Sequence, residues 1–457
     1  MKQATPVNDL RRFLARLESR QALHRIAVQV DADLEIAAIT DRVCKHSGEP
    51  PALLFEQVRG YRIPVATNLF GSMRRAAWAL GLNDIEAAAQ RLATGIAGAA
   101  GVDAACRLRC LLRQPEYAPA LQARADWQDR SMPGPDLDQL PALRCWPGDG
   151  GRYLTLPQVV TRHPDGGTAN VGIYRVQLLG PRRAALHWRD SSDAARHCRA
   201  WHRRGLPMPV SIAMGGDPAL LFAAAFPLPP DTDEAALAGL LGGRPMIMSP
   251  SAHSDLPVPS AAEFVIEGLA YPGETALEGP FGNHTGFYQP ASRVPLLRIV
   301  AISQRCDPLL PATVVGPPPT ENCILGQTVA RLLVPLLRSD HPDIVDIHMP
   351  VEGIFHGAAL IAVRSGTDGR ALLQALWRSG PLRAARLLVV AEADRVPDPG
   401  DFFWRVLNRL RPDRDLLIHN GCLGIDATVA LPDAPTVEPD TRMAEQLQRR
   451  WREYGFH

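Results

Sequence analysis

Lysine is almost absent from this sequence of 457 residues. Lys2 and Lys45 are the only lysines among 49 basic residues, so arginine carries nearly all of the positive charge. We attribute this bias to codon usage, and it argues against catalysis through a lysine Schiff base. The formal net charge is only +1 at pH 7, which excludes the basic surplus that nucleic-acid-binding domains carry.

Long hydrophobic runs are also missing. No apolar run reaches the roughly 20 residues that a transmembrane helix needs, and the opening string, MKQATPVNDLRRF, lacks the apolar core of a signal peptide. The eight cysteines are scattered, and no second pair joins Cys106 and Cys110 to complete a zinc site. These absences predict a cytoplasmic protein with free thiols and no membrane span.

The N-terminal part of the chain alternates strand and helix patterns. Apolar runs at 51–58 and 63–71 predict strands, and periodic patterns at 72–82 and 84–99 predict helices. Apolar residues make up 46% of the whole chain, enough to bury cores in two or three domains. The alternation predicts a small α/β domain over residues 1–118.

Strands outnumber helices in the middle of the chain, between residues 119 and 315. The strings VGIYRVQLLG (171–180) and AALHW (184–188) flank a turn at Gly180-Pro181, so they predict a β-hairpin. Further strand patterns follow in PVSIAMG, AEFVIEGLA and VPLLRIVAISQR. A continuous series of strands of this kind predicts a sandwich or a barrel.

The last part of the chain, residues 316–457, begins with a long apolar helical pattern from about residue 321. Pro335 lies inside that pattern and predicts a kink. Strand and helix patterns then alternate to the end of the apolar sequence. This region is therefore expected to form a second α/β domain.

Three separate segments carry side chains that could build one site. Asn170 in NVGIYR and Glu234 at the start of a predicted helix supply hard oxygen donors for a small divalent cation. Arg175 supplies a planar fork for a carboxylate, and Glu278 in EGPFGNHTGFY supplies a titratable acid or base. Taken singly, each also has an ordinary structural interpretation: a first-turn helix glutamate, an ion-pair partner in a sheet, and a turn residue.

Eight strings, in order along the chain, resemble the UbiD family of decarboxylases that use prenylated FMN. They are CWPGDGGRYLTLPQVVTR (145–162), NVGIYR (170–175), ALHW (185–188), DEAALAG (233–239), EGPFGNHTGFY (278–288), PPTENCILG (318–326), VDIHMPVEGIFH (345–356) and GIDAT (424–428). The resemblance implies an N-terminal α/β domain (1–118) and a central split β-barrel of the flavin-reductase type that binds the cofactor (119–315). It also implies a linker helix with a C-terminal α/β oligomerisation domain (316–457).

The resemblance also implies roles for individual residues. Asn170 and Glu234 would ligate a divalent ion, Mn²⁺ or Mg²⁺, that grips the flavin phosphate, with K⁺ as a further ion. Arg175 would hold the substrate carboxylate, and Glu278 would be the first acid of the active-site pair. Cofactor contacts are implied for Asn170, Ile173, Tyr174, Arg175, His187, Trp188, Arg189, Ala224, Ala225, Phe226 and Glu234.

Two positions depart from the family pattern. Relatives place a metal-ligating histidine shortly after the HW pair, where this chain has Ser191, a weak ligand. Relatives carry a second acid where this chain has Asn283, the third implied catalytic position, and an amide does not exchange protons as a carboxyl does. Either Glu278 or an ordered water must then return the proton, or Asn283 marks a changed substrate class or a structural turn.

The resemblance implies reversible, non-oxidative decarboxylation of an aromatic, heteroaromatic or α,β-unsaturated carboxylic acid. Loss of CO₂ leaves a carbanion-like centre, and no side chain of this sequence can absorb that charge, so a cofactor must do so. The alternatives are a catalytically impaired or regulatory flavin-binding homologue, and an FMN reductase. Expected partners are the small acid, a prenyl-FMN-synthesising enzyme that supplies the cofactor, and further copies of this chain in a dimer or hexamer.

Overall fold

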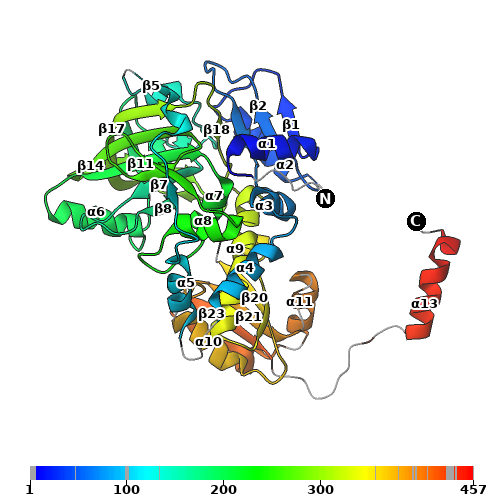
Figure 1. The fold of residues 1–457 in the computed structure, drawn as a ribbon. Helices are drawn as coiled ribbons and strands as arrows, with labels where there is room; N and C mark the ends of the chain where they lie inside the picture. The colour runs from blue at the N-terminus through cyan, green and yellow to red at the C-terminus, as the bar shows by residue number, and fades with distance from the viewer. Residues whose placement is uncertain are drawn as a thin grey trace.

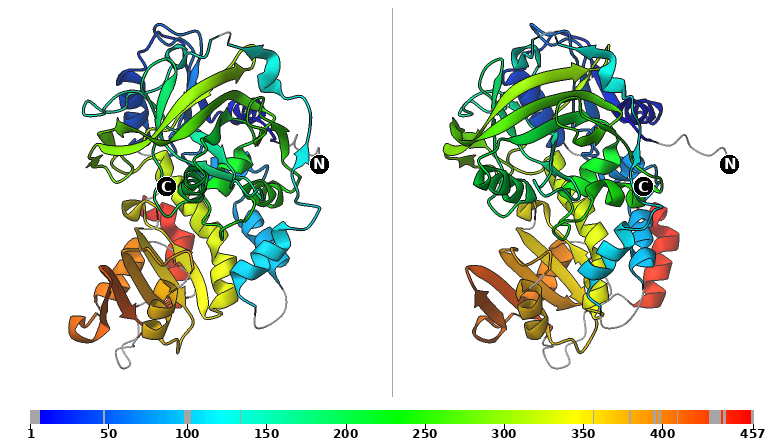
Figure 2. Two further views of the ribbon diagram at one scale, coloured as in Figure 1. Left: turned by 90° about the vertical axis from the view of Figure 1, so that its left-hand side faces the viewer. Right: turned by 60° about the vertical axis from the view of Figure 1, so that its left-hand side comes forward.

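A long helix, α9 (Glu321–Asp340), lies between two bodies of the molecule (Figure 1). The N-terminal region and a curled sheet form one body, and a smaller α/β domain forms the other, as further views also show (Figure 2). The computed structural model describes residues 7–46, 48–97, 102–132, 134–355, 357–378, 380–393, 396, 399–408, 410–428, 437 and 440–455.

The N-terminal region is an α/β layer, as predicted. Its small sheet has the order β1-β2-β3-β18, and the last strand, β18, comes from a segment that follows the curled sheet in sequence. The strands predicted at 51–58 and 63–71 are present but shorter. The elements are α1 (Leu10–Ser19), β1 (Leu23–Ile26), α2 (Glu35–Cys44), β2 (Ala52–Phe55), β3 (Val65–Thr67), α3 (Met73–Ala79), α4 (Glu86–Ile96), α5 (Ala104–Leu112) and β18 (Leu310–Pro311).

The central region is built on one strongly curled antiparallel sheet of nine strands, half of a barrel, which confirms the predicted fold class. Its order is β6-β9-β10-β17-β14-β11-β7-β8, with β5 paired to β17. Its strands are β5 (Arg130–Ser131), β6 (Tyr153–Leu154), β7 (Pro157–Thr161), β8 (Asn170–Ile173), β9 (Val176–Leu178), β10 (Arg183–Leu186), β11 (Met208–Gly215), β14 (Ala262–Glu278) and β17 (Ser292–Gln304).

Helices and short strands surround this sheet. The helices α7 and α8 pack against each other and against β8. The peripheral elements are β4 (Ala120–Leu121), α6 (Asp193–Arg203), α7 (Pro218–Ala225), α8 (Glu234–Gly242), β12 (Ile247–Pro250), β13 (Pro257–Pro259), β15 (Phe281–Gly282) and β16 (Tyr288–Gln289), with 3-10 turns at Asp126–Asp129 and Leu137–Gln139.

Local sequence explains where the helices beside β8 begin. Asp217 caps α7 by accepting a hydrogen bond from a first-turn N–H group, and Pro218 occupies the first helical position, where its missing N–H costs nothing. Asp233 caps α8 in the same way, so that helix begins at Glu234, as predicted. Each cap fixes which side chain stands at the N-terminal end of its helix.

The hairpin predicted over residues 171–188 is confirmed only in its second half. The strands β9 and β10 pair antiparallel, but the chain leaves its strand at Tyr174 and Arg175. Before this break β8 pairs with β7, at the opposite end of the sheet order from β9. One continuous apolar string therefore serves both ends of the curled sheet, and the crossing between them places Arg175.

The C-terminal domain carries a five-stranded sheet of order β19-β20-β21-β23-β22, as the α/β prediction requires. Helix α9 packs against α4 and β19 and continues through Pro335. The elements are β19 (Ile344–His348), β20 (Ala358–Val363), α10 (Gly369–Arg378), β21 (Leu387–Glu392), α11 (Pro399–Leu407), α12 (Pro412–Asp415), β22 (Leu416–His419), β23 (Cys422–Ala427) and α13 (Thr441–Arg450), with 3-10 turns at Val351–Gly353 and Trp451–Tyr454.

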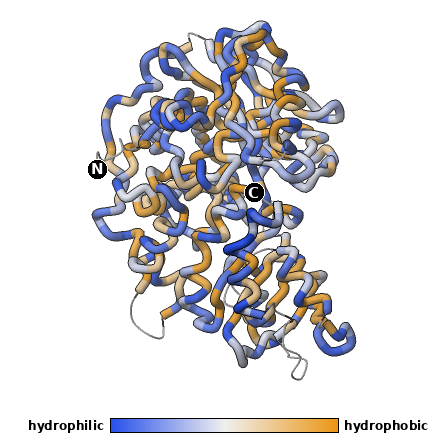
Figure 3. The backbone as a smooth tube through the Cα atoms, turned by 90° about the vertical axis from the view of Figure 1, so that its right-hand side faces the viewer, coloured by the Kyte–Doolittle hydropathy of each residue, from blue (hydrophilic) through white to orange (hydrophobic). Residues whose placement is uncertain are grey.

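The last helix, α13, stands apart from the rest of the chain (Figure 1). None of its residues is buried, and the chain near the C-terminus is mostly hydrophilic (Figure 3). Across the described part of the chain, no helix is both long and apolar enough to cross a lipid bilayer.

Candidate active site

Arg175 and Glu278 form a buried ion pair at the end of β14. Arg175 Nε donates to Glu278 Oε1 at 2.7 Å, and Nη2 donates to Oε2 at 2.8 Å. The carboxylate of Glu278 is 0% exposed, and the Arg175 side chain is 13% exposed. A bidentate pair between planar groups is both strong and geometrically specific. The fold thus joins two residues that the sequence separates by 103 positions.

The surroundings of Glu278 hold it as a carboxylate. Burial raises its pKa, but hydrogen bonds from His187 and Arg175, together with the charge of Arg175, outweigh burial and lower the pKa to about 2. His187 Nδ1 lies 2.9 Å from Glu278 Oε2. At neutral pH Glu278 is therefore ionised, so it can donate a proton only after it has received one.

Gln289 completes a ring of polar contacts around Arg175. Arg175 Nη1 donates to Gln289 Oε1 at 2.9 Å, and Arg175 Nη2 lies 3.1 Å from His187 Nδ1. The guanidinium also lies over the ring of Phe281, 4.5 Å from its centroid. All three guanidinium nitrogens thus have protein partners, so a substrate carboxylate must use the remaining N–H groups or displace Gln289 or His187.

A short hairpin carries Phe281 and Gln289 to this position. Strands β15 and β16 pair antiparallel, with Phe281 opposite Gln289. Asp149, which is 6% exposed, anchors the hairpin because its Oδ1 accepts a hydrogen bond from the N–H of Gly282 at 2.7 Å. The conspicuous string EGPFGNHTGFY is therefore a strand end followed by an anchored hairpin that covers the Arg175–Glu278 pair.

Asn170 and Glu234 lie close together at the start of β8, five positions before Arg175 in the sequence. The N–H of Val171 donates to Glu234 Oε2 at 3.0 Å, which brings the first residue of α8 against the residue after Asn170. Both side chains are buried, Asn170 at 8% and Glu234 at 7% exposure. The two residues that the resemblance implies as metal ligands are thus neighbours in the fold.

The chemistry of this pair suits a bound cation. Burial raises the pKa of Glu234 well above its usual value, and the charged groups acting on it, Asp233 and Asp193, are also acidic. Asn170 Nδ2 and Thr232 Oγ1 are buried without a hydrogen-bond partner in the described structure. A buried carboxylate beside unpartnered polar atoms is unfavourable unless a cation and its ligands satisfy them.

A complete metal-binding cluster of protein side chains is not formed here. No three His, Cys, Asp or Glu side chains converge in the parts of the chain described above. A divalent ion at Asn170 and Glu234 would therefore need oxygen ligands from another source, such as a phosphate group or water. This requirement agrees with an ion that links the protein to a phosphorylated cofactor.

Apolar side chains gather around the same end of the curled sheet. Tyr174 and Trp188 meet edge to face, with ring centroids 6.1 Å apart. The C-terminal end of α7 contributes small and aromatic residues that pack with β8. The implied cofactor contacts found in these two groups are Ile173, Tyr174, Trp188, Ala224, Ala225 and Phe226.

Asn283, Arg189 and Ser191 occupy different surroundings. Asn283 Oδ1 accepts hydrogen bonds from the N–H and the hydroxyl of Thr285, at 2.8 and 2.6 Å, so it stabilises the turn of the hairpin loop. Arg189 and Ser191 are exposed. Burial, together with the charges of Arg189 and Arg175, lowers the pKa of His284 in that loop. Among the alternatives that the sequence left open for Asn283, these contacts favour the structural turn.

The sequence patterns gave no indication of Gln289 or of the contacts that the His187 imidazole makes. Gln289 lies one residue beyond the EGPFGNHTGFY string, and no spacing rule marks it. Its pairing opposite Phe281 follows only from the two-residue strands β15 and β16. His187 was expected to contact the cofactor, whereas its ring also contacts Glu278. Both residues reach the site through cross-strand geometry that the linear sequence does not display.

Family models match most of the chain, in three consecutive segments. Residues 14–93 match the N-terminal domain of 3-octaprenyl-4-hydroxybenzoate carboxy-lyase, residues 120–318 match its Rift-related domain, and residues 323–442 match its C-terminal domain. An uncharacterized protein of Aquifex aeolicus is 38% identical over 425 residues, which cover 91% of this chain and 87% of that protein.

Two solved structures share the arrangement. An evolved dimeric form of the UbiD-class enzyme HmfF from Pelotomaculum thermopropionicum, in complex with prFMN, has a TM-score of 0.83 and 27% identity and covers 96% of this chain and 100% of its own. The closed form of vanillic acid decarboxylase from Sedimentibacter hydroxybenzoicus has a TM-score of 0.85 and covers 99% of both chains. At 24% identity the second likeness shows the fold alone.

Proposed function

Because the chain belongs to the UbiD family of carboxy-lyases, we propose that it decarboxylates an aromatic, heteroaromatic or α,β-unsaturated carboxylic acid with prenylated FMN. The reaction is non-oxidative and reversible. The observation that carries this proposal is the buried, bidentate pair of Arg175 and Glu278, which joins the end of β14 to the segment that follows β8. The similar HmfF structure with prFMN supports the choice of cofactor.

Arg175 and Glu278 have different roles toward the substrate. Arg175 orients the substrate carboxylate through the N–H groups that Glu278 leaves free, which fixes the bond that breaks. Glu278 rests as a carboxylate and passes a proton to the carbon after CO₂ has left. Burial of the pair excludes water from both steps, since Glu278 is 0% exposed.

In this proposal, Asn170 and Glu234 would hold a divalent ion, Mn²⁺ or Mg²⁺, that would help to bind the cofactor phosphate. The buried carboxylate of Glu234 supports a cation at this place, and the unpartnered Nδ2 of Asn170 can donate to an acceptor such as a phosphate oxygen. When bound, prenylated FMN supplies the electron sink for the charge that CO₂ loss leaves on carbon. A flavin-prenylating enzyme must supply that cofactor, and the dimeric HmfF structure supports self-association of this chain.

The test uses protein produced together with a flavin-prenylating enzyme. The absorption spectrum of the purified protein reports cofactor, and CO₂ release from a panel of aromatic, heteroaromatic and α,β-unsaturated acids reports activity. We expect release from at least one class, and exchange of the corresponding product C–H with deuterium from solvent. A cofactor-loaded protein that neither releases CO₂ nor exchanges deuterium with any class contradicts the proposal.

A second candidate is a flavin-binding homologue that has lost catalysis. The observations that favour it are the exposure of Ser191, where relatives have a metal-ligating histidine, and the engagement of Asn283 in a turn. This candidate predicts a bound flavin with no turnover. Substituting Ser191→His together with Asn283→Asp would then be expected to create CO₂ release in a protein that otherwise has none.

A further inference from the structure

His187 bridges the buried Glu278 and the surface. Its Nδ1 lies 2.9 Å from Glu278 Oε2, and its Nε2 lies 3.4 Å from Gln289 Nε2. The His187 side chain is 19% exposed, whereas Glu278 is 0% exposed. Solvent therefore reaches the imidazole but does not reach the carboxylate that it touches.

Gln289 decides which nitrogen of His187 carries the proton. The amide oxygen of Gln289 accepts from Arg175 Nη1 at 2.9 Å, so the amide nitrogen must face the imidazole. An amide nitrogen only donates, and His187 Nε2 must therefore accept and carry no proton. The ring proton then sits on Nδ1 and is donated to Glu278 Oε2 at 2.9 Å. Nδ1 also lies 3.1 Å from Arg175 Nη2, but that nitrogen donates to the same Oε2 at 2.8 Å, so both side chains direct a proton at the carboxylate.

We propose that His187, held in this tautomer by Gln289, resupplies Glu278 with the proton that Glu278 gives to carbon. This inference rests on the proposed decarboxylation and answers a need within it, since Glu278 is ionised at rest and Asn283 cannot act as a second acid. His187 acts through Glu278 and is therefore a positioning and relay residue. Gln289 positions His187.

The proton balance closes over one turnover. The His187 Nδ1–H bond breaks as a Glu278 Oε2–H bond forms, and Nε2 takes one proton from water, so the ring stays neutral. Glu278 then gives its proton to the carbon that CO₂ has left. Exchange with water at the exposed edge returns the ring to its resting tautomer. One solvent proton replaces each CO₂ lost from a substrate carboxylate, as the overall reaction requires.

The first test reads the tautomer directly and needs no activity. Protein without cofactor is labelled with ¹⁵N-histidine, and the His187 signals are assigned by their loss in His187→Asn. We expect an Nδ1–H tautomer in the wild type and a mixture of tautomers in Gln289→Leu, which lacks the amide donor. An Nε2–H tautomer in the wild type would overturn the proposal.

The second test uses the cofactor-loaded enzyme. His187→Asn keeps a hydrogen-bond donor near Glu278 but cannot relay a proton, so kcat and deuterium exchange should fall about 100-fold, with KM changed less than about threefold. Gln289→Leu should lower kcat about tenfold. The matched control is His253→Asn, because His253 also contacts a buried glutamate, Glu267, at 3.4 Å, outside this site.

Each outcome separates the relay from the proposed function. A wild-type enzyme without CO₂ release or exchange refutes the proposed decarboxylation. The ¹⁵N measurement of the His187 tautomer still tests how Gln289 positions His187. Wild-type kcat and exchange in a cofactor-loaded His187→Asn refute the relay alone. If His187→Asn loses its cofactor, the kcat of Gln289→Leu and the tautomer decide, and unchanged values for both refute the relay.

Discussion

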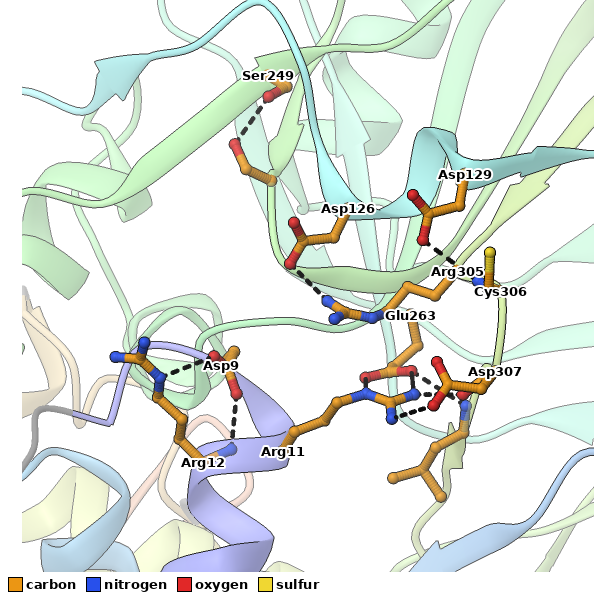
Figure 4. A network of polar contacts seen from close by, with 12 residues as sticks. Asp9, Arg11, Arg12, Asp126, Asp129, Ser249, Glu263, Arg305, Cys306 and Asp307 are labelled. Atoms are coloured by element: carbon orange, nitrogen blue, oxygen red, sulfur yellow. Dashed lines mark hydrogen bonds and ion pairs between the residues drawn. The ribbon is translucent and has the colours of Figure 1, made fainter.

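Two glutamates on the same strand, β14, each hold an arginine through a bidentate ion pair. Near the start of the strand, Glu263 accepts from Arg11 Nε at 3.1 Å and from Nη2 at 2.9 Å (Figure 4). At its end, Glu278 accepts from Arg175 at 2.7 and 2.8 Å. Burial raises the pKa of Glu263 in spite of Arg11, whereas the pKa of Glu278 is lowered to about 2.

The two arginines differ in their exposure and in their other partners. Arg11 is 33% exposed and also pairs with Asp307 at 2.9 Å, so Glu263 shares its cation with a second acid. Arg175 is 13% exposed and has a single acidic partner, and His187 adds a further donor to Glu278. Glu263 also accepts from the N–H of Leu309 at 3.1 Å, yet burial outweighs its donors, whereas Arg175 and His187 together outweigh the burial of Glu278.

The largest expected difference is between Glu278→Gln and Glu263→Gln, which each remove the carboxylate of one ion pair. Glu278→Gln should lower kcat about 1000-fold and abolish deuterium exchange, because the proton carrier is lost. Glu263→Gln should leave kcat within about threefold and reduce the free energy of unfolding by about 1–3 kcal/mol, because it ties α1 to the sheet. CO₂ release, product NMR in D₂O and urea unfolding measure these effects. Wild-type exchange by Glu278→Gln would refute its assigned role.

Glu234 is a third buried glutamate, and in the described part of the chain no arginine pairs with it. Glu234→Ala should abolish retention of flavin through gel filtration, because the phosphate would lose the ion that links it to the protein. Glu267→Ala, at a buried glutamate elsewhere on β14, is the control and should retain flavin. Ser191→His should slow the loss of flavin in the presence of a chelator. Full flavin absorbance in Glu234→Ala counts against the metal site.

A smaller effect should separate the two arginines. Arg175→Lys keeps the charge but loses the planar fork, so kcat/KM should fall at least about tenfold, or about 1.4 kcal/mol. Arg11→Lys should change kcat/KM less than about twofold, because that pair is structural. Steady-state kinetics on the preferred acid measures both. Equal losses in the two variants would mean that the ion pairs do not differ in role.

The smallest expected effect is that acid changes the contributions of Glu278 and Glu263 to stability in opposite directions. The folded pKa of Glu278 lies below its ordinary value of 4.5, so its contribution to stability is present above about pH 4.5 and is lost as the pH falls toward 2. The folded pKa of Glu263 lies above that value, so its contribution is present at low pH and is lost as the pH rises through it.

Thermal unfolding across acidic pH measures this sign. On acidification, the stability of the wild type relative to Glu278→Gln should decrease, whereas its stability relative to Glu263→Gln should increase. Comparing each variant with the wild type at the same pH removes the contribution of the other carboxylates. Parallel curves for the two variants would show that the pKa values of the two glutamates shift in the same direction.

Prediction from sequence succeeded where local chemistry is decisive. The cap at Asp217 with Pro218, the helix that begins at Glu234 and the alternation in the C-terminal domain all appear in the structure. Prediction was incomplete where a strand changes partners, since the string 171–180 breaks at Arg175 to join both ends of the sheet. The domain boundaries stay predictions, and β18 shows that the N-terminal sheet uses residues 310–311.

The family, the fold class and the candidate site residues Arg175, Glu278, Asn170 and Glu234 could be predicted from residue strings, because such strings carry that information directly. The tertiary structure gave the direction of each pKa shift, downward for Glu278 and upward for Glu263, since both are glutamates on one strand and their pKa values depend on burial and on the groups that fold against them. It also decided that Gln289 faces His187, because cross-strand pairing in a two-residue hairpin leaves no pattern in the sequence.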